Sequence, residues 1–91
     1  MALGYYFAPK SFSSEQYDET TRRLDEAGLG APAGRICHCA FEGEGGINVF
    51  DVWSSEEEFA AFGQTLMPIL ADVGVDPGQP HVAKVHNMIV A

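Results

Sequence analysis

The pattern of apolar and polar positions divides the chain into six regular segments. Strand-like runs occupy residues 2–8, 35–42, 47–53 and 81–90. In the two stretches 13–27 and 55–73, apolar residues recur every three or four positions, which is the spacing of a helix with one buried face. The order strand, helix, strand, strand, helix, strand therefore predicts an α+β protein.

Capping residues mark the start of both predicted helices. A serine is followed three residues later by Gln or Glu in three places: Ser13 with Gln16, Ser54 with Glu57, and Ser55 with Glu58. Phe12 is placed to pack against Tyr17 in the first helix. Gly28 and Gly74 follow the last apolar positions and predict the helix ends. Pro68 predicts a kink or a restart within the second helix, because its ring clashes with the preceding turn.

The two middle strands flank the sequence Gly43-Glu44-Gly45-Gly46, which is typical of a hairpin turn. A loop of two residues and a loop of four residues give the same strand register, whereas a loop of three would break it. The expected cross-strand pairs are His38 with Asp51, Ile36 with Trp53, and Ala40 with Val49.

The element order predicts a ferredoxin-like βαββαβ fold, in which both helices lie on one face of an antiparallel sheet. Ninety-one residues suffice for one domain, spanning 1–91. Several strands are apolar on both faces, for example at Val49 and Trp53 on one side and at Phe50 and Val52 on the other. Two helices cover only one face, so we expect a homodimer in which a second copy covers the other.

Charge and composition exclude several classes of partner. Thirteen Asp and Glu against five Lys and Arg give a net charge of −8, which repels nucleic acids and anionic membrane surfaces. No apolar run is long enough to span a membrane, and the N-terminus lacks the features of a signal peptide, so we expect a cytoplasmic protein. Cys37 and Cys39 lie two apart in a strand, too far for a disulfide, and we expect free thiols.

Three segments resemble the dimeric α+β barrel superfamily: residues 51–62, residues 66–70 and residues 85–87. This superfamily includes antibiotic biosynthesis monooxygenases, haem-degrading monooxygenases and small uncharacterised bacterial proteins, and the chain is most similar to the last group. The resemblance implies a homodimeric barrel with a pocket between sheet and helices. The haem-degrading members take an axial histidine from the helix after the third strand, but residues 55–73 contain no histidine. We therefore expect no cofactor.

His38 and Asp51 are the main candidates for catalysis. The expected register places them on one face together with Trp53. A carboxylate beside an imidazole fixes its tautomer and raises its basicity, which prepares a general base for an acidic phenol or enol. The alternative is a structural cross-strand pair that satisfies two half-buried polar groups. His86 is a weaker candidate. It and Asn87 point to opposite faces of a regular strand, so at most one of them can lie on the same face as His38.

Aromatic residues complete the predicted site. Trp53, Tyr5, Phe59 and Phe62 are the candidate substrate-binding residues, although such aromatic residues more often form the hydrophobic core of a small domain. Tyr6 and Tyr17 could also donate hydrogen bonds to a ligand. No metal site is expected, because His38 faces away from Cys37 and Cys39 in a regular strand. The glycine-rich turn leads into a strand, not a helix, which disfavours phosphate binding.

These residues support two hypotheses. The first is a cofactor-independent monooxygenase, or a related cyclase or isomerase, acting on an aromatic or polyketide-like molecule with a His38–Asp51 base. The second is a non-catalytic protein that binds a small apolar molecule or assists another protein. An open pocket bordered by His38 favours the first hypothesis, whereas a space filled by Phe59, Phe62 and Leu66 favours the second.

Overall fold

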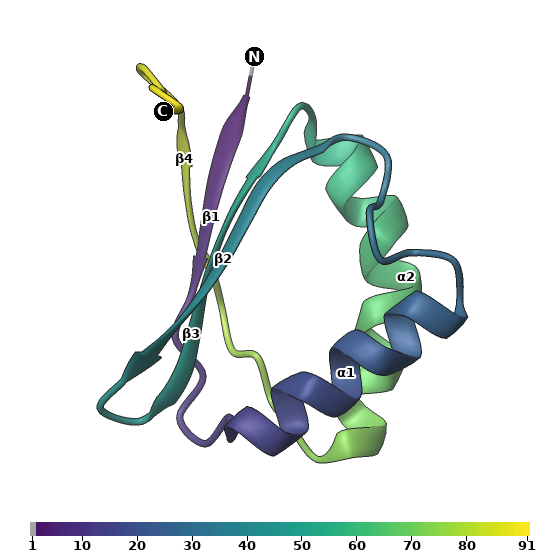
Figure 1. Cartoon of the computed structure of the whole chain (residues 1–91). Coiled ribbons are helices and arrows are strands. Elements are labelled where there is room, and N and C mark those ends of the chain that lie inside the picture. Colours follow the sequence, from purple (N-terminus) through teal and green to yellow (C-terminus); the bar gives the residue numbers. More distant parts are fainter. Residues whose placement is uncertain (1) are drawn as a thin grey trace.

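In the computed structural model, which describes residues 2–91, two helices cover one face of a four-stranded antiparallel sheet (Figure 1). The elements are β1 (Leu3–Phe7), α1 (Ser14–Glu26), β2 (Arg35–Gly43), β3 (Gly46–Trp53), α2 (Glu56–Val73) and β4 (His81–Lys84). Their order confirms the prediction from the apolar pattern. The strand order β2-β3-β1-β4 is compatible with a ferredoxin-like arrangement.

The helix boundaries follow the predicted capping residues. Ser13 caps α1 with a complete capping box: its hydroxyl accepts from the Gln16 backbone N–H at 3.1 Å, and its own N–H donates to Gln16 Oε1 at 2.9 Å. Of the two serines before α2, Ser55 is the cap and accepts from the Glu58 N–H at 3.2 Å. Gly74 ends α2 in the left-handed conformation with φ of 86°.

Helix α2 runs without interruption through Pro68, so the helix does not restart there. Its buried residues are Phe62 and Leu70. Within residues 2–91, no helix is both long and apolar enough to cross a membrane.

The β2–β3 hairpin has a two-residue loop, Glu44–Gly45, since Gly43 pairs with Gly46. The expected pairs of His38 with Asp51 and of Ala40 with Val49 are confirmed.

The expected pair of Ile36 with Trp53 is wrong. A β-bulge between Arg35 and Cys37 brings Arg35 opposite Trp53 instead, and Ile36 remains 48% exposed. A bulge inserts one extra residue, so every position before it changes its partner.

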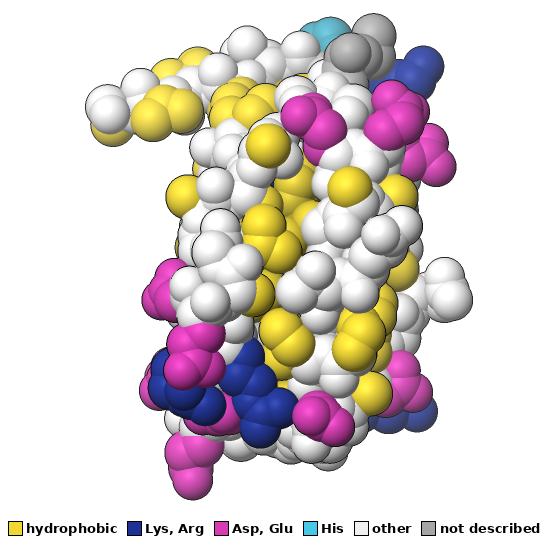
Figure 2. Space-filling model, turned by 90° about the vertical axis from the view of Figure 1, so that its right-hand side faces the viewer, with side chains coloured by type: hydrophobic (Ala, Val, Ile, Leu, Met, Phe, Trp, Pro, Cys, Tyr) yellow, Lys and Arg dark blue, Asp and Glu magenta, His cyan; other side chains and the backbone are white. Residues whose placement is uncertain are grey.

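The hydrophobic core lies between the sheet and the helices. Trp53 at the end of β3 is completely buried, and it packs with Tyr5 and Phe7 of β1, Leu24 of α1 and Phe62 of α2. A second cluster closes the opposite end of the layer and consists of Phe12, Ile47, Leu70 and Val75. Figure 2 shows the outer face of the helices. Apolar side chains lie along the centre of this face, and charged side chains lie mainly toward its two ends.

The fourth strand is shorter than expected, because it ends at Lys84 and not at residue 90. It pairs only with β1, which begins at Leu3. The Val85 N–H still donates to the carbonyl of Ala2 at 3.0 Å, but among residues 2–91 no strand pairs with the residues after it. The last strand, β4, therefore lies at the edge of the sheet beside the first strand, β1 (Figure 1).

The helix-free face of the sheet is apolar. Phe41 and Phe50 are 41% and 37% exposed there, and the ring of Tyr6 stacks on that of Phe41 with centroids 6.1 Å apart. Cys37 and Cys39 lie on this face opposite Val52 and Phe50, as the register predicted, and both are free thiols.

Candidate functional site

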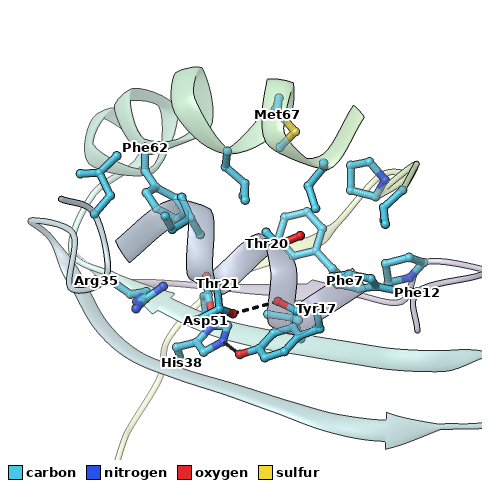
Figure 3. Close-up of a pocket in the computed structure, with 18 of the residues that line it drawn as sticks. Phe7, Phe12, Tyr17, Thr20, Thr21, Arg35, His38, Asp51, Phe62 and Met67 are labelled. Carbon is cyan, nitrogen blue, oxygen red and sulfur yellow. Dashed lines mark hydrogen bonds and ion pairs between the residues drawn. The ribbon is translucent and has the colours of Figure 1, made fainter. Parts of the chain in front are cut away.

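A cavity of about 100 Å³ lies between the sheet and the two helices, partly open to solvent. Figure 3 shows its two ends. One end carries the polar side chains of Tyr17, Thr21, Arg35, His38 and Asp51. The remaining wall is apolar apart from Thr20 and includes Phe7, Phe12, Leu24, Val49, Phe59, Phe62, Leu66, Leu70 and Val75. An enclosed apolar cavity of about 150 Å³ holds a benzene ring. This cavity is smaller but open on one side, so it suits at most a single small ring whose polar groups face the polar end.

At the polar end, His38 lies between two hydrogen-bonding partners. Its Nδ1 is 2.6 Å from Asp51 Oδ1, and its Nε2 is 2.6 Å from the hydroxyl of Tyr17. The second Asp51 oxygen accepts from Trp53 Nε1–H at 3.2 Å. The side chain of Asp51 is 7% exposed and that of His38 is 26% exposed. The result is a continuous chain from buried Trp53 to the solvent-accessible Tyr17.

The direction of each hydrogen bond follows from the chemistry of the partners. Trp53 has only a donor, and the carboxylate of Asp51 accepts with both oxygens. In the neutral imidazole, His38 then donates from Nδ1–H, and Nε2 accepts the Tyr17 hydroxyl proton. Burial raises the pKa of Tyr17, while the nearby charge of Arg35 opposes that rise. The Tyr17 phenol is thus neutral at pH 7, with lone pairs available to a ligand.

Local structure fixes Tyr17 above the sheet. Tyr17 lies in the first turn of α1, where its ring packs on Phe12 with centroids 5.9 Å apart. Phe12 is itself tied to the hairpin, because its carbonyl accepts from the Ile47 N–H at 2.7 Å. Gly46 permits this contact: its φ is 127°, and a Cβ at this position would lie 2.5 Å from the Phe12 carbonyl oxygen.

The other predicted site residues fall into three groups. Phe59 and Phe62 line the cavity. Tyr5 and Trp53 are buried in the core behind the cavity wall, and Trp53 acts there by holding Asp51. His86 lies after β4 at an exposed position, away from the cavity lining.

The sequence analysis missed the roles of two residues at the polar end. Tyr17 was expected to contact a ligand, not to bind His38, and Arg35 was not singled out at all. The only sequence signal for Arg35 is that it is the sole Lys or Arg between positions 24 and 83.

Within the described part of the chain, no three His, Cys, Asp or Glu side chains converge as metal ligands. Cys37 and Cys39 lie on the sheet face opposite His38, so the Cys-His-Cys sequence does not form a cluster.

The chain matches no protein-family model and no curated protein sequence. Its fold is similar to the crystal structure of a protein of unknown function from Nitrosomonas europaea. The TM-score is 0.54 and the sequence identity is 16%, over 99% of this chain and 90% of that chain. At this identity the likeness extends to the fold alone.

Proposed function

We propose that this protein is an enzyme that transfers a proton to or from a small aromatic or enolic ring compound, without a cofactor. The observation that carries the proposal is the position of His38, which is oriented by Asp51, bonded to Tyr17 and exposed to an apolar cavity. A base in such a site meets the ligand where water is largely displaced, which strengthens its electrostatic interactions.

The chemistry can be written for an acidic O–H group on the ligand. The ligand proton passes to the Tyr17 oxygen while the Tyr17 proton passes to His38 Nε2. The bonding electron pair stays on the ligand as a phenolate or enolate, and the imidazolium is stabilised by Asp51. Cofactor-independent monooxygenases, in which dioxygen then attacks the anion, share this step with cyclases and isomerases, in which the anion reacts at carbon.

The proposal includes a homodimer built as a dimeric α+β barrel. The paired positions on the helix-free face include Tyr6, Phe41 and Phe50 and, His81 aside, no ionisable group other than thiols and phenols. Two chains of charge −8 repel each other, so an uncharged apolar face is where they approach at least cost. A second copy packed there would bury the exposed phenylalanines of both.

Ketonisation of the enol of phenylpyruvate tests the proton transfer, because this enol carries its acidic group on a small aromatic compound. We expect the wild-type protein to accelerate the reaction and His38→Gln to lower the rate by roughly 10²- to 10⁴-fold. His81→Gln is the matched control, since His81 lies on β4 outside the cavity lining. Equal rates for wild type and His38→Gln would overturn the proposal.

A non-catalytic small-molecule-binding protein is the second candidate. The observation that favours it is the Tyr17 hydroxyl, which occupies Nε2 of His38 at 2.6 Å. If the Tyr17 hydroxyl holds Nε2 without relaying a ligand proton to it, the cavity binds a ligand without proton transfer. Ligand binding combined with no rate acceleration would select this candidate.

A further inference from the structure

We propose that Arg35 makes the polar end of the cavity a binding site for an anion, and that the ligand is a ring compound bearing a carboxylate next to its acidic hydroxyl. This inference rests on the proposed function for the ring and its acidic proton, and it adds the charge of the ligand. It follows from the local backbone of β2, the surroundings of the Arg35 side chain, and its position relative to Tyr17 and His38.

The bulge in β2 decides which side chain faces the cavity. A regular strand would place Ile36 opposite Trp53 and therefore on the same face as His38. The bulge between Arg35 and Cys37 places Arg35 opposite Trp53, and Ile36 is 48% exposed. An apolar wall residue is thus replaced by a cation. Bulges commonly occur beside active sites, where they redirect a side chain.

The guanidinium of Arg35 has no carboxylate partner among residues 2–91. Arg22 and Arg23, in contrast, form ion pairs with Glu19, and Arg23 also pairs with Asp72. This difference is notable in a chain with thirteen acidic residues. Arg35 lines the cavity and pairs with none of the carboxylates in residues 2–91. Its positive charge is therefore available to an anionic ligand.

Arg35 is nevertheless held in place. Its Nη2–H donates to the carbonyl of Gly30 at 3.0 Å, and its guanidinium carbon lies 5.9 Å from the centroid of the Phe62 ring. These contacts orient the side chain and leave most of its five N–H donors unused. A planar guanidinium with free donors binds a carboxylate through two parallel hydrogen bonds.

The position of the anion fixes the shape of the ligand. Arg35, His38 and Tyr17 all lie at the polar end of the cavity (Figure 3). A ring in the apolar part therefore directs its carboxylate and its acidic hydroxyl toward the same end, and we place them on neighbouring atoms of the ring. Arg35 also offsets the negative field of the chain, which otherwise repels anions.

Calorimetric binding of two matched probes tests the inference. The probes are 2-hydroxybenzoate and its neutral analogue 2-hydroxybenzamide, which share the ring and the hydroxyl. The proteins are wild type, Arg35→Gln, Arg35→Lys and the control Arg22→Gln, whose arginine lies on the exposed side of α1. Thermal unfolding of each variant verifies that it is folded, and Arg35→Lys retains the charge where the glutamine variant fails to fold.

We expect wild type to bind 2-hydroxybenzoate more tightly than the amide. Arg35→Gln should weaken binding of the acid by roughly 10- to 100-fold and leave the amide nearly unchanged, because only the charged hydrogen bonds are lost. Arg35→Lys should fall between, and Arg22→Gln should match wild type.

Two results would overturn the inference: equal affinities of wild type for acid and amide, or no binding of the acid at millimolar concentration. If the amide still binds and His38→Gln still lowers the ketonisation rate, the proton-transfer function stands without the anion site. If binding depends on Arg35 but the rate does not depend on His38, the anion site stands and the proton-transfer function fails.

Discussion

The two faces of the sheet are formed by alternate residues of the same strands, yet their surroundings are opposite. Toward the helices, Trp53 is completely buried, Asp51 is nearly so, and a cavity remains between the layers. Away from the helices, Phe41 and Phe50 are uncovered.

The difference separates a face suited to a small ligand from a face suited to another protein. Both faces are apolar in the sequence, so the sequence pattern alone does not distinguish them. An apolar face that is covered but incompletely filled accommodates a small ligand, whereas an apolar face that is flat and uncovered calls for another protein surface. Substitutions on one face should therefore change chemistry and leave assembly intact, and substitutions on the other should do the reverse.

The largest effect is expected for Asp51→Ala on the helix-covered face. It removes the acceptor of both His38 Nδ1–H and Trp53 Nε1–H. Unfolding in urea should show a loss of about 1–3 kcal/mol, because buried donors are left without partners. The ketonisation rate should fall as well. Asp18→Ala on the exposed side of α1 is the control; equal losses for both variants would mean that Asp51 is not a buried anchor.

Phe50→Glu tests the helix-free face. A charge placed among the exposed rings should weaken the dimer by roughly 30-fold or more, the usual effect of removing a central aromatic contact. Sedimentation velocity should show monomer at concentrations where wild type is dimeric, while 2-hydroxybenzoate binding is retained. Ala61→Glu adds the same charge on exposed α2 and should leave the dimer intact. A wild-type monomer at micromolar concentration would contradict this account.

Tyr17→Phe and Tyr6→Phe compare one hydroxyl on each face. Tyr17 donates to His38 Nε2, and Tyr6 accepts from Asn48 on the helix-free face at 3.2 Å. Loss of the Tyr17 hydroxyl should slow ketonisation by roughly tenfold, less than loss of His38, because Nε2 is still present to take the proton. Tyr6→Phe should have no effect on the rate. A faster Tyr17→Phe enzyme would show that Tyr17 blocks the base and does not relay to it.

The smallest effect is expected outside both faces, at the exposed ion pairs of α1. Arg22 and Arg23 donate to Glu19 and lower the pKa of its carboxyl to about 2 from its usual 4.5. Because the pKa is depressed in the folded state, this contribution to stability is complete above about pH 4.5 and is lost as the pH falls toward 2. The Tm of Glu19→Gln should therefore lie slightly below that of wild type at pH 7. The two Tm values should approach each other as the pH falls from 4.5 toward 2. A constant difference at all pH values would contradict the assignment.

The features that the sequence predicts are those set by nearby residues. The capping box of Ser13 and Gln16 and the left-handed Gly74 follow from interactions within one helical turn. The pairing of His38 with Asp51 follows from a short hairpin whose loop fixes the register.

The features that it does not predict depend on distant parts of the chain. The contact of Tyr17 with His38 joins α1 to β2 across 21 positions and requires the docking of the helix on the sheet. The bulge at Arg35 is not visible in the local sequence. Ile36 is apolar, as a regular strand would require at that position, so the sequence predicts a regular strand there. The end of β4 at Lys84 is set by where β1 begins, not by the residues after it.

The most direct measurement of the central claim is the absorbance spectrum of 4-nitrophenol bound in the cavity, since the neutral phenol and the phenolate absorb at different wavelengths. If the Tyr17–His38–Asp51 chain takes the ligand proton, wild type should bind this phenol as phenolate at a pH where the free phenol is mostly neutral. His38→Gln should bind it in the neutral form. A bound phenol that ionises at the same pH in wild type and in His38→Gln would contradict the account.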